Sequence, residues 1–152
     1  TTNWPTVATV DTTKFYQITL TPLTGFNFVI NSISFKHKAD VATTPMLFVI
    51  NYSNDNFVTS KTITTTAVSS TSVETPYSTT GLSIPVSSTG PLTVKIFAYS
   101  ADATTEAFSI KNLVLSGDLV PTEAVTCLAT KATFNERKTK SPHVWVVRSN
   151  SP

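Results

Sequence analysis

The sequence contains few residues of the kinds that catalysis and metal binding require. Its 152 residues include one cysteine and two histidines, and only 13% of them are charged. A single cysteine excludes an internal disulfide bond and any zinc site built from several cysteines. The carboxylates are few and scattered, and no motif joins a nucleophile to a base. We therefore expect a protein that is not an enzyme.

Long apolar runs and basic motifs of the nucleic-acid-binding type are also missing. No stretch approaches ~18 consecutive apolar residues, so no membrane insertion is expected. The net charge is +2, without a basic run interleaved with stacking aromatics, which argues against nucleic-acid binding. Polarity comes instead from 29 threonines and 17 serines. This composition, and a start without Met or an apolar signal core, predict a processed protein that is secreted, extracellular or on the cell surface.

The composition also favours strands over helices, because β-branched Thr, Val and Ile fit a pleated surface. Apolar residues alternate with polar ones, as in Tyr16, Ile18 and Leu20, and most regularly in 92–99. The alternation predicts seven or eight short strands, which are separated by turn signals. This pattern predicts an all-β fold, an antiparallel two-sheet β-sandwich or jelly roll.

The alternation slips by one residue at two places. Ile30 is followed by Ile33, and Ile110 is followed by Leu113, where an unbroken strand would have apolar residues at 32 and 112. One extra residue near Asn31 and near Asn112 predicts a β-bulge or a corner, where a strand could pass from one sheet to the other.

The charge balance changes near the end of the chain. Residues 1–119 contain six lysines and seven acidic residues, whereas residues 120–152 contain five basic residues and two glutamates. We predict a sandwich module over 1–119 and a C-terminal extension over 120–152. The extension could be an extra strand, a linker or a segment added by cloning.

Four segments carry a resemblance to a known family: Thr24–Phe35 (TGFNFVINSISF), Ser53–Phe57 (SNDNF), Val94–Tyr99 (VKIFAY) and Phe108–Gly117 (FSIKNLVLSG). They resemble the jelly-roll modules of secreted, multidomain bacterial proteins, found in Bacteroidota, which are similar to carbohydrate-binding modules. The likeness covers roughly 10–119 and implies polysaccharide binding or surface display.

The resemblance does not imply a calcium site. Calcium-bearing relatives often have an acidic residue in the final strand, where this sequence has Lys111. Asn54-Asp55-Asn56 could contribute oxygen ligands, but this spacing is more typical of an Asx turn. A structural calcium ion stays an open alternative that no motif supports, and no other cofactor is expected.

Sugar binding needs flat aromatic faces with polar groups beside them. Lys95, Phe97 and Tyr99 alternate with the apolar face of their strand and form the best candidate group, and Tyr77 is a candidate platform in a polar stretch. The same residues could instead form a second packing layer, with Tyr99 capping Phe97.

A second candidate site is the basic run Lys36-His37-Lys38 at the end of a strand. Its cations could pair with a sulfated or uronic polysaccharide. The alternative is a solvated rim without a ligand. A dyad of His37 with one of the many serines would arise by chance.

We predict a non-catalytic polysaccharide-binding module of a secreted multidomain protein, whose partner is a polysaccharide or cell-surface glycan. The alternative is a structural subunit of a surface fibre or adhesin, which pairs with neighbouring domains or protomers by strand addition. In that case Val144–Val147 is the candidate donor strand.

Overall fold

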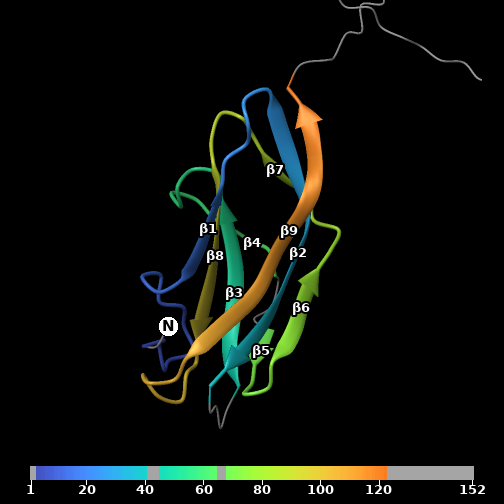
Figure 1. Cartoon of the computed structure of the whole chain (residues 1–152). Helices are drawn as coiled ribbons and strands as arrows, with labels where there is room; N and C mark the ends of the chain where they lie inside the picture. The colour runs from blue at the N-terminus through green and yellow to red at the C-terminus, as the bar shows by residue number, and fades with distance from the viewer. Residues whose placement is uncertain (1–2, 41–44, 65–67, 123–152) are drawn as a thin grey trace, which may run out of the picture.

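The computed structural model describes residues 3–40, 45–64 and 68–122. Over these residues the chain forms strands, turns and loops, and none of them forms a helix that could cross a membrane. The strands form two layers (Figure 1). They are β1 (Tyr16–Leu20), β2 (Phe26–Ala39), β3 (Met46–Ser53), β4 (Lys61–Thr62), β5 (Val68–Ser70), β6 (Thr75–Thr79), β7 (Ile84–Val86), β8 (Leu92–Tyr99) and β9 (Phe108–Pro121).

Each layer is an antiparallel sheet. In the first sheet the order is β1-β8-β3-β4, and β5 also pairs with β3. In the second sheet β2 pairs with β9 along nearly its whole length, and its other edge pairs with β6 and β7. The predicted two-sheet β-sandwich is therefore confirmed. The described residues contain nine strands, of which β4 and β5 have only two and three residues.

Both frame shifts are β-bulges in the β2–β9 ladder. Ile30 pairs with Gly117 and Ser32 pairs with Ser116, so Asn31 has no residue opposite it. The second irregularity lies between the pairs Ser34–Val114 and Lys36–Lys111, where β9 has one residue more than β2. Asn112 lies there and adopts a left-handed φ of 53°. The bulges occur where the sequence predicts them, but the strands do not pass to the other sheet there, since β2 and β9 stay paired beyond each bulge.

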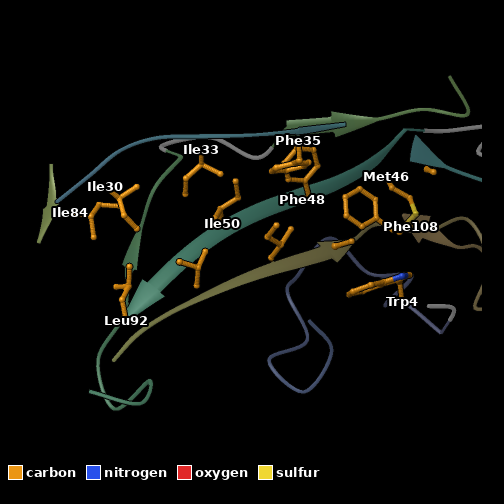
Figure 2. Packing of buried hydrophobic residues seen from close by; sticks show 14 of the residues in the cluster. Trp4, Ile30, Ile33, Phe35, Met46, Phe48, Ile50, Ile84, Leu92 and Phe108 are labelled. Atoms are coloured by element: carbon orange, nitrogen blue, oxygen red, sulfur yellow. The ribbon is translucent and has the colours of Figure 1, made fainter. Parts of the chain in front are cut away.

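The core lies between the two sheets, and aromatic rings fill one end of it (Figure 2). Phe48 on β3 contacts Phe35 on β2 and Phe108 on β9, with ring centroids 5.6 and 5.5 Å apart. Trp4, which precedes β1, covers this end through an edge contact with Phe108 at 6.1 Å. The N-terminal segment is thus part of the fold.

The strand β9 extends beyond the predicted module boundary at residue 119. Val120 and Pro121 still pair with β2, opposite Asn27 and Phe26. Residues 123–152 of the predicted extension, including Val144–Val147, lie outside the described residues.

Candidate functional site

The predicted aromatic group on β8 lies on the outer face of the first sheet. Phe97 is only 3% exposed, and its ring makes an edge-to-face contact with the Phe15 ring, with the centroids 5.9 Å apart. The Lys95 ammonium lies 3.8 Å from the centroid of Phe15 and 4.3 Å from that of Phe57. Each ring therefore already interacts with a group of the protein itself. Tyr99 is half-buried on the same face.

In this arrangement Phe97 is not an open platform, because its ring is buried, and the Lys95 ammonium lies over Phe15 and Phe57. β8 is a central strand between β1 and β3, and Phe15 and Phe57 come from segments next to those strands. Their rings cover what would otherwise be an open platform, so the alternative of a second packing layer describes this face. The sequence shows the alternation within β8, but not which distant rings lie over it.

Tyr77 does not form a loop platform either. It lies within β6, directly opposite Phe35, and its ring packs inward at 5.0 Å from Phe35 and 5.5 Å from Phe48. Burial raises the pKa of the Tyr77 phenol. The prediction that Tyr77 offers its face to a sugar does not fit this position, because that face contacts the core.

The basic run at the end of β2 is divided between the two faces of its sheet. Lys36 and Lys38 point to the outer face, whereas His37 points into the core and is only 2% exposed. The His37 ring lies 4.8 Å from the Phe48 ring, and its Nδ1 is 2.9 Å from the Ser70 hydroxyl oxygen. Burial lowers the pKa of His37. His37 is therefore a core residue and cannot join a surface cation site.

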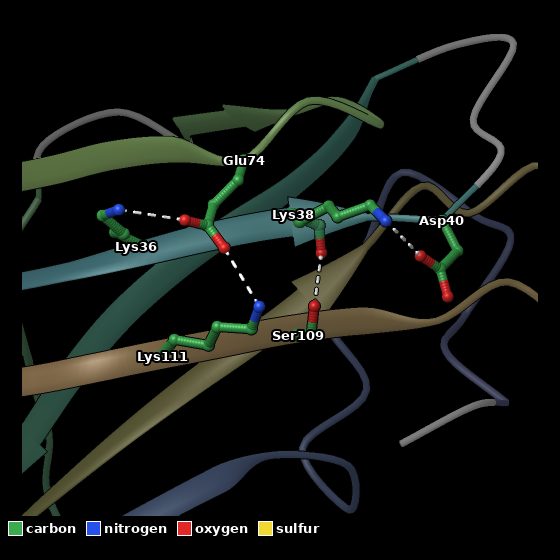
Figure 3. A network of polar contacts seen from close by, with 6 residues as sticks. All are labelled: Lys36, Lys38, Asp40, Glu74, Ser109 and Lys111. Carbon is green, nitrogen blue, oxygen red and sulfur yellow. Dashed lines mark hydrogen bonds and ion pairs between the residues drawn. The ribbon is translucent and has the colours of Figure 1, made fainter.

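The two lysines are paired with carboxylates (Figure 3). Lys36 on β2 and Lys111 on β9 both bind Glu74, with N–O distances of 3.0 and 3.1 Å, and Lys38 binds Asp40 at 3.3 Å. Hydrogen bonds from Lys36 and Lys111 lower the pKa of Glu74. Sequence reasoning missed Glu74, which comes from the turn before β6, and the pairing of Lys36 with Lys111 across the ladder.

The loop after β3 is held by Asp55. Its carboxylate accepts hydrogen bonds from the Ser53 hydroxyl and from the backbone N–H and hydroxyl of Thr59, at 2.5 to 3.0 Å. These bonds lower the pKa of Asp55 to about 2. The loop has the local bonding of an Asx turn. Among the described residues, no three His, Cys, Asp or Glu side chains lie close enough together to hold a metal ion.

A groove of about 390 Å³ opens at one end of the sandwich, beside β7. Two amides help to shape it: the Asn27 Oδ1 accepts the Ser88 N–H at 2.7 Å, and the Asn54 amide donates to the Pro85 carbonyl at 3.3 Å. Hydroxyls of Ser87 and Thr89 also line it. Sequence reasoning did not select this groove, because its residues come from separate turns.

The other surface feature is the outer edge of β9. Among the residues that the structure describes, β9 pairs only with β2, so its second edge is open. Three large apolar side chains on it are exposed: Val114 by 50%, Leu119 by 70% and Val120 by 43%. A second cleft, of about 210 Å³, lies along this edge between β9 and the end of β1.

Comparisons with known proteins add little to this description. No protein-family model and no curated protein matches the chain. One similar solved structure is titled "Structure of infectious bursal disease virus Gx strain" and is 10% identical, with a TM-score of 0.29. The match covers 70% of this chain and 30% of that chain. A likeness at this level carries no argument about function, and the protein is classed by its own structure as an antiparallel two-sheet β-sandwich.

Proposed function

We propose that the chain is a non-catalytic structural module of a secreted or cell-surface protein, which assembles with neighbouring protomers by strand addition at the open edge of β9. The observation that carries this proposal is the long open edge with exposed Val114, Leu119 and Val120. An unpaired edge offers a row of backbone donors and acceptors to an incoming strand, and exposed apolar side chains add burial to those hydrogen bonds.

The positions of the candidate aromatic residues favour assembly by strand addition over polysaccharide binding. A sugar platform needs an accessible ring face. Phe97 is covered by Phe15, and the Tyr77 ring packs on Phe35, so neither ring supports polysaccharide binding at the position first predicted. The β9 edge, by contrast, is accessible along the segment between the bulge at Asn112 and Pro121.

Amide hydrogen exchange tests the assembly proposal. The exchange of 113–120 is compared between a dilute and a concentrated solution of the full chain. We expect the outward-facing amides of this segment to exchange at least about tenfold more slowly when the chain is concentrated, because they then donate to a neighbouring strand. The loop 53–59 provides the control and should keep its rate. Equal rates for 113–120 at both concentrations would contradict assembly at this edge.

Polysaccharide binding remains a second candidate, and the groove beside β7 favours it. Asn27, Asn54 and Thr89 bring amide and hydroxyl groups to a concave surface, where they could hydrogen-bond sugar hydroxyls.

Affinity electrophoresis in gels that contain polysaccharide tests the second candidate. We expect retention of the chain to be lost in Asn54→Ala together with Thr89→Val, and to be kept in the exposed control Ser60→Ala. Retention of all three proteins alike would place any sugar site elsewhere, and no retention of the unchanged chain on any polysaccharide would reject this function.

A further inference from the structure

Among the residues that the structure describes, five other strands lie at sheet edges, and they are short or contain proline or lysine, whereas β9 is long. β6 and β7 contain Pro76 and Pro85, β4 has two residues beginning with Lys61, and β5 and β1 have three and five residues. Proline, lysine and short length are the features that usually prevent edge-to-edge pairing. On β9 the eight residues of Leu113–Val120 contain no proline and a single charge, Asp118. This segment is therefore the least protected edge in the described sandwich.

The apolar residues of this segment, exposed or half-buried, lie on both faces of the sheet. Directly opposed residues of an antiparallel pair share a face. Leu115 and Leu119 oppose core-facing Ile33 and Phe28, so they point to the inner side. Val114 and Val120 alternate with them along β9 and point to the outer side. An added strand must therefore offer apolar side chains on both faces, in the same alternation.

A second copy of β9 meets this requirement in one antiparallel register. When Gly117 pairs with Gly117 of the second copy on a twofold axis, Val114 meets Val120 and Leu115 meets Leu119, each twice. Ser116 then meets Asp118, so the carboxylate faces a hydroxyl donor and not its own symmetry mate. Like charges directly opposite one another would be unfavourable.

The neighbouring registers pair the side chains of the two copies less favourably. An axis at position 116 places Val114 opposite Asp118, and an axis at position 118 places the two Asp118 carboxylates opposite each other. An axis at position 115 pairs Val114 with Ser116. Among these registers, only the axis at Gly117 pairs Val114 with Val120 and Leu115 with Leu119.

The open cleft beside β9 supports the same axis. It is lined by Leu20, Phe28 and Ile30 together with the five residues 115–119, so it is centred on Gly117. In the twofold register, Leu115 and Leu119 of the second copy lie on this inner side. Their side chains would extend the core across the gap between β9 and the end of β1, which stabilises the pair by burying apolar surface on both copies.

From this complementarity we infer that the partner of the β9 edge is β9 of a second copy of the chain, paired antiparallel about a twofold axis at Gly117. The inference rests on the proposed assembly function and names its partner strand. The interface is isologous, so it closes as a dimer and joins the two β2-containing sheets into one continuous sheet. It makes no use of Val144–Val147 as a donor strand.

Sedimentation equilibrium of the full chain tests the dimer. We expect a monomer–dimer equilibrium that Leu119→Asp weakens by about a hundredfold, because the substitution occurs twice across the axis and each copy costs at least tenfold. Val58→Asp is the matched control, because Val58 is also apolar, is 84% exposed and lies in the loop after β3. Circular dichroism shows whether each variant keeps the strand content of the parent, and Val120→Lys provides a second substitution of the edge.

Disulfide crosslinking tests the register in a Cys127→Ser background. A mixture of Val114→Cys and Val120→Cys chains should form a crosslinked heterodimer, while either variant alone should crosslink poorly. A dimer that survives Leu119→Asp, or a mixture that fails to crosslink, overturns the twofold register. If the amides of 113–120 exchange more slowly at high concentration but the crosslink does not form, assembly at the β9 edge is supported and the twofold pairing of β9 with itself is rejected. The partner would then be another strand. A chain that stays monomeric and shows unchanged exchange overturns both proposals.

Discussion

Acidification should destabilise the fold through His37 before it affects the carboxylates. His37 is only 2% exposed and is surrounded by aromatic rings, and its Nδ1 is hydrogen-bonded to the Ser70 hydroxyl. Burial disfavours the charged form, so the folded-state pKa of His37 lies below its ordinary value of 6.5. Well above pH 6.5 both the folded and the unfolded chain hold His37 neutral, and the residue adds no pH dependence.

Below pH 6.5 the unfolded chain binds a proton that the folded chain excludes. The free energy of unfolding then falls by up to about 1.4 kcal/mol per pH unit, until the folded-state pKa is reached. At about pH 5.5 the loss from His37 alone can reach about 1.4 kcal/mol relative to neutral pH. This window lies above that of Asp11, Asp55 and Glu74, since the pKa values of these three carboxylates are lowered.

Urea denaturation at about pH 7.5, 6.5 and 5.5 measures this effect. We compare the parent with His37→Phe combined with Ser70→Ala, which removes the titrating group without leaving the buried hydroxyl unpaired. This double variant should lose the pH dependence between pH 6.5 and 5.5, whatever its stability at neutral pH. His143→Gln is the control for the other histidine and should keep the dependence. Equal pH dependence in the parent and the double variant would refute the reasoning, as would an NMR titration of His37 centred near pH 6.5.

Three further predictions concern single side chains. Phe48→Ala should lower the free energy of unfolding by about 3–5 kcal/mol in urea denaturation, because Phe48 is fully buried and packs from the first sheet against two rings of the second sheet. A loss below about 1 kcal/mol would contradict this packing. Gly117→Ala should lower the midpoint of thermal unfolding, because its Cβ would lie 2.0 Å from the Val29 carbonyl oxygen; an unchanged midpoint would mean that the two strands separate easily there. The Asp55 carboxylate should titrate near pH 2 by NMR. Its hydrogen bonds therefore stabilise the loop at pH values above 3.8, the ordinary pKa, and this stabilisation is lost as the pH falls towards 2. Titration near 3.8 would show that these bonds do not form in solution.

Local sequence patterns determined much of the fold. The alternation of apolar residues predicts the two-sheet sandwich, because a strand with one buried face repeats its side chains every two residues. The slips after Ile30 and Ile110 locate both bulges, since an added residue reverses the faces of everything that follows it. The Asx turn at Asp55 is equally local, because its partners lie within four residues.

The candidate sites depended on contacts between segments far apart in the chain, and tertiary structure alone decided them. Period-two alternation places Phe97 opposite the core face of β8, but Phe15 and Phe57 bring their rings there from other parts of the chain. The alternation along β2 already places His37 in the core, whereas Glu74 reaches Lys36 from a turn that is distant in the sequence. The open edge of β9 follows from sheet order, which depends on which strands pair and cannot be read from the alternation within any one strand.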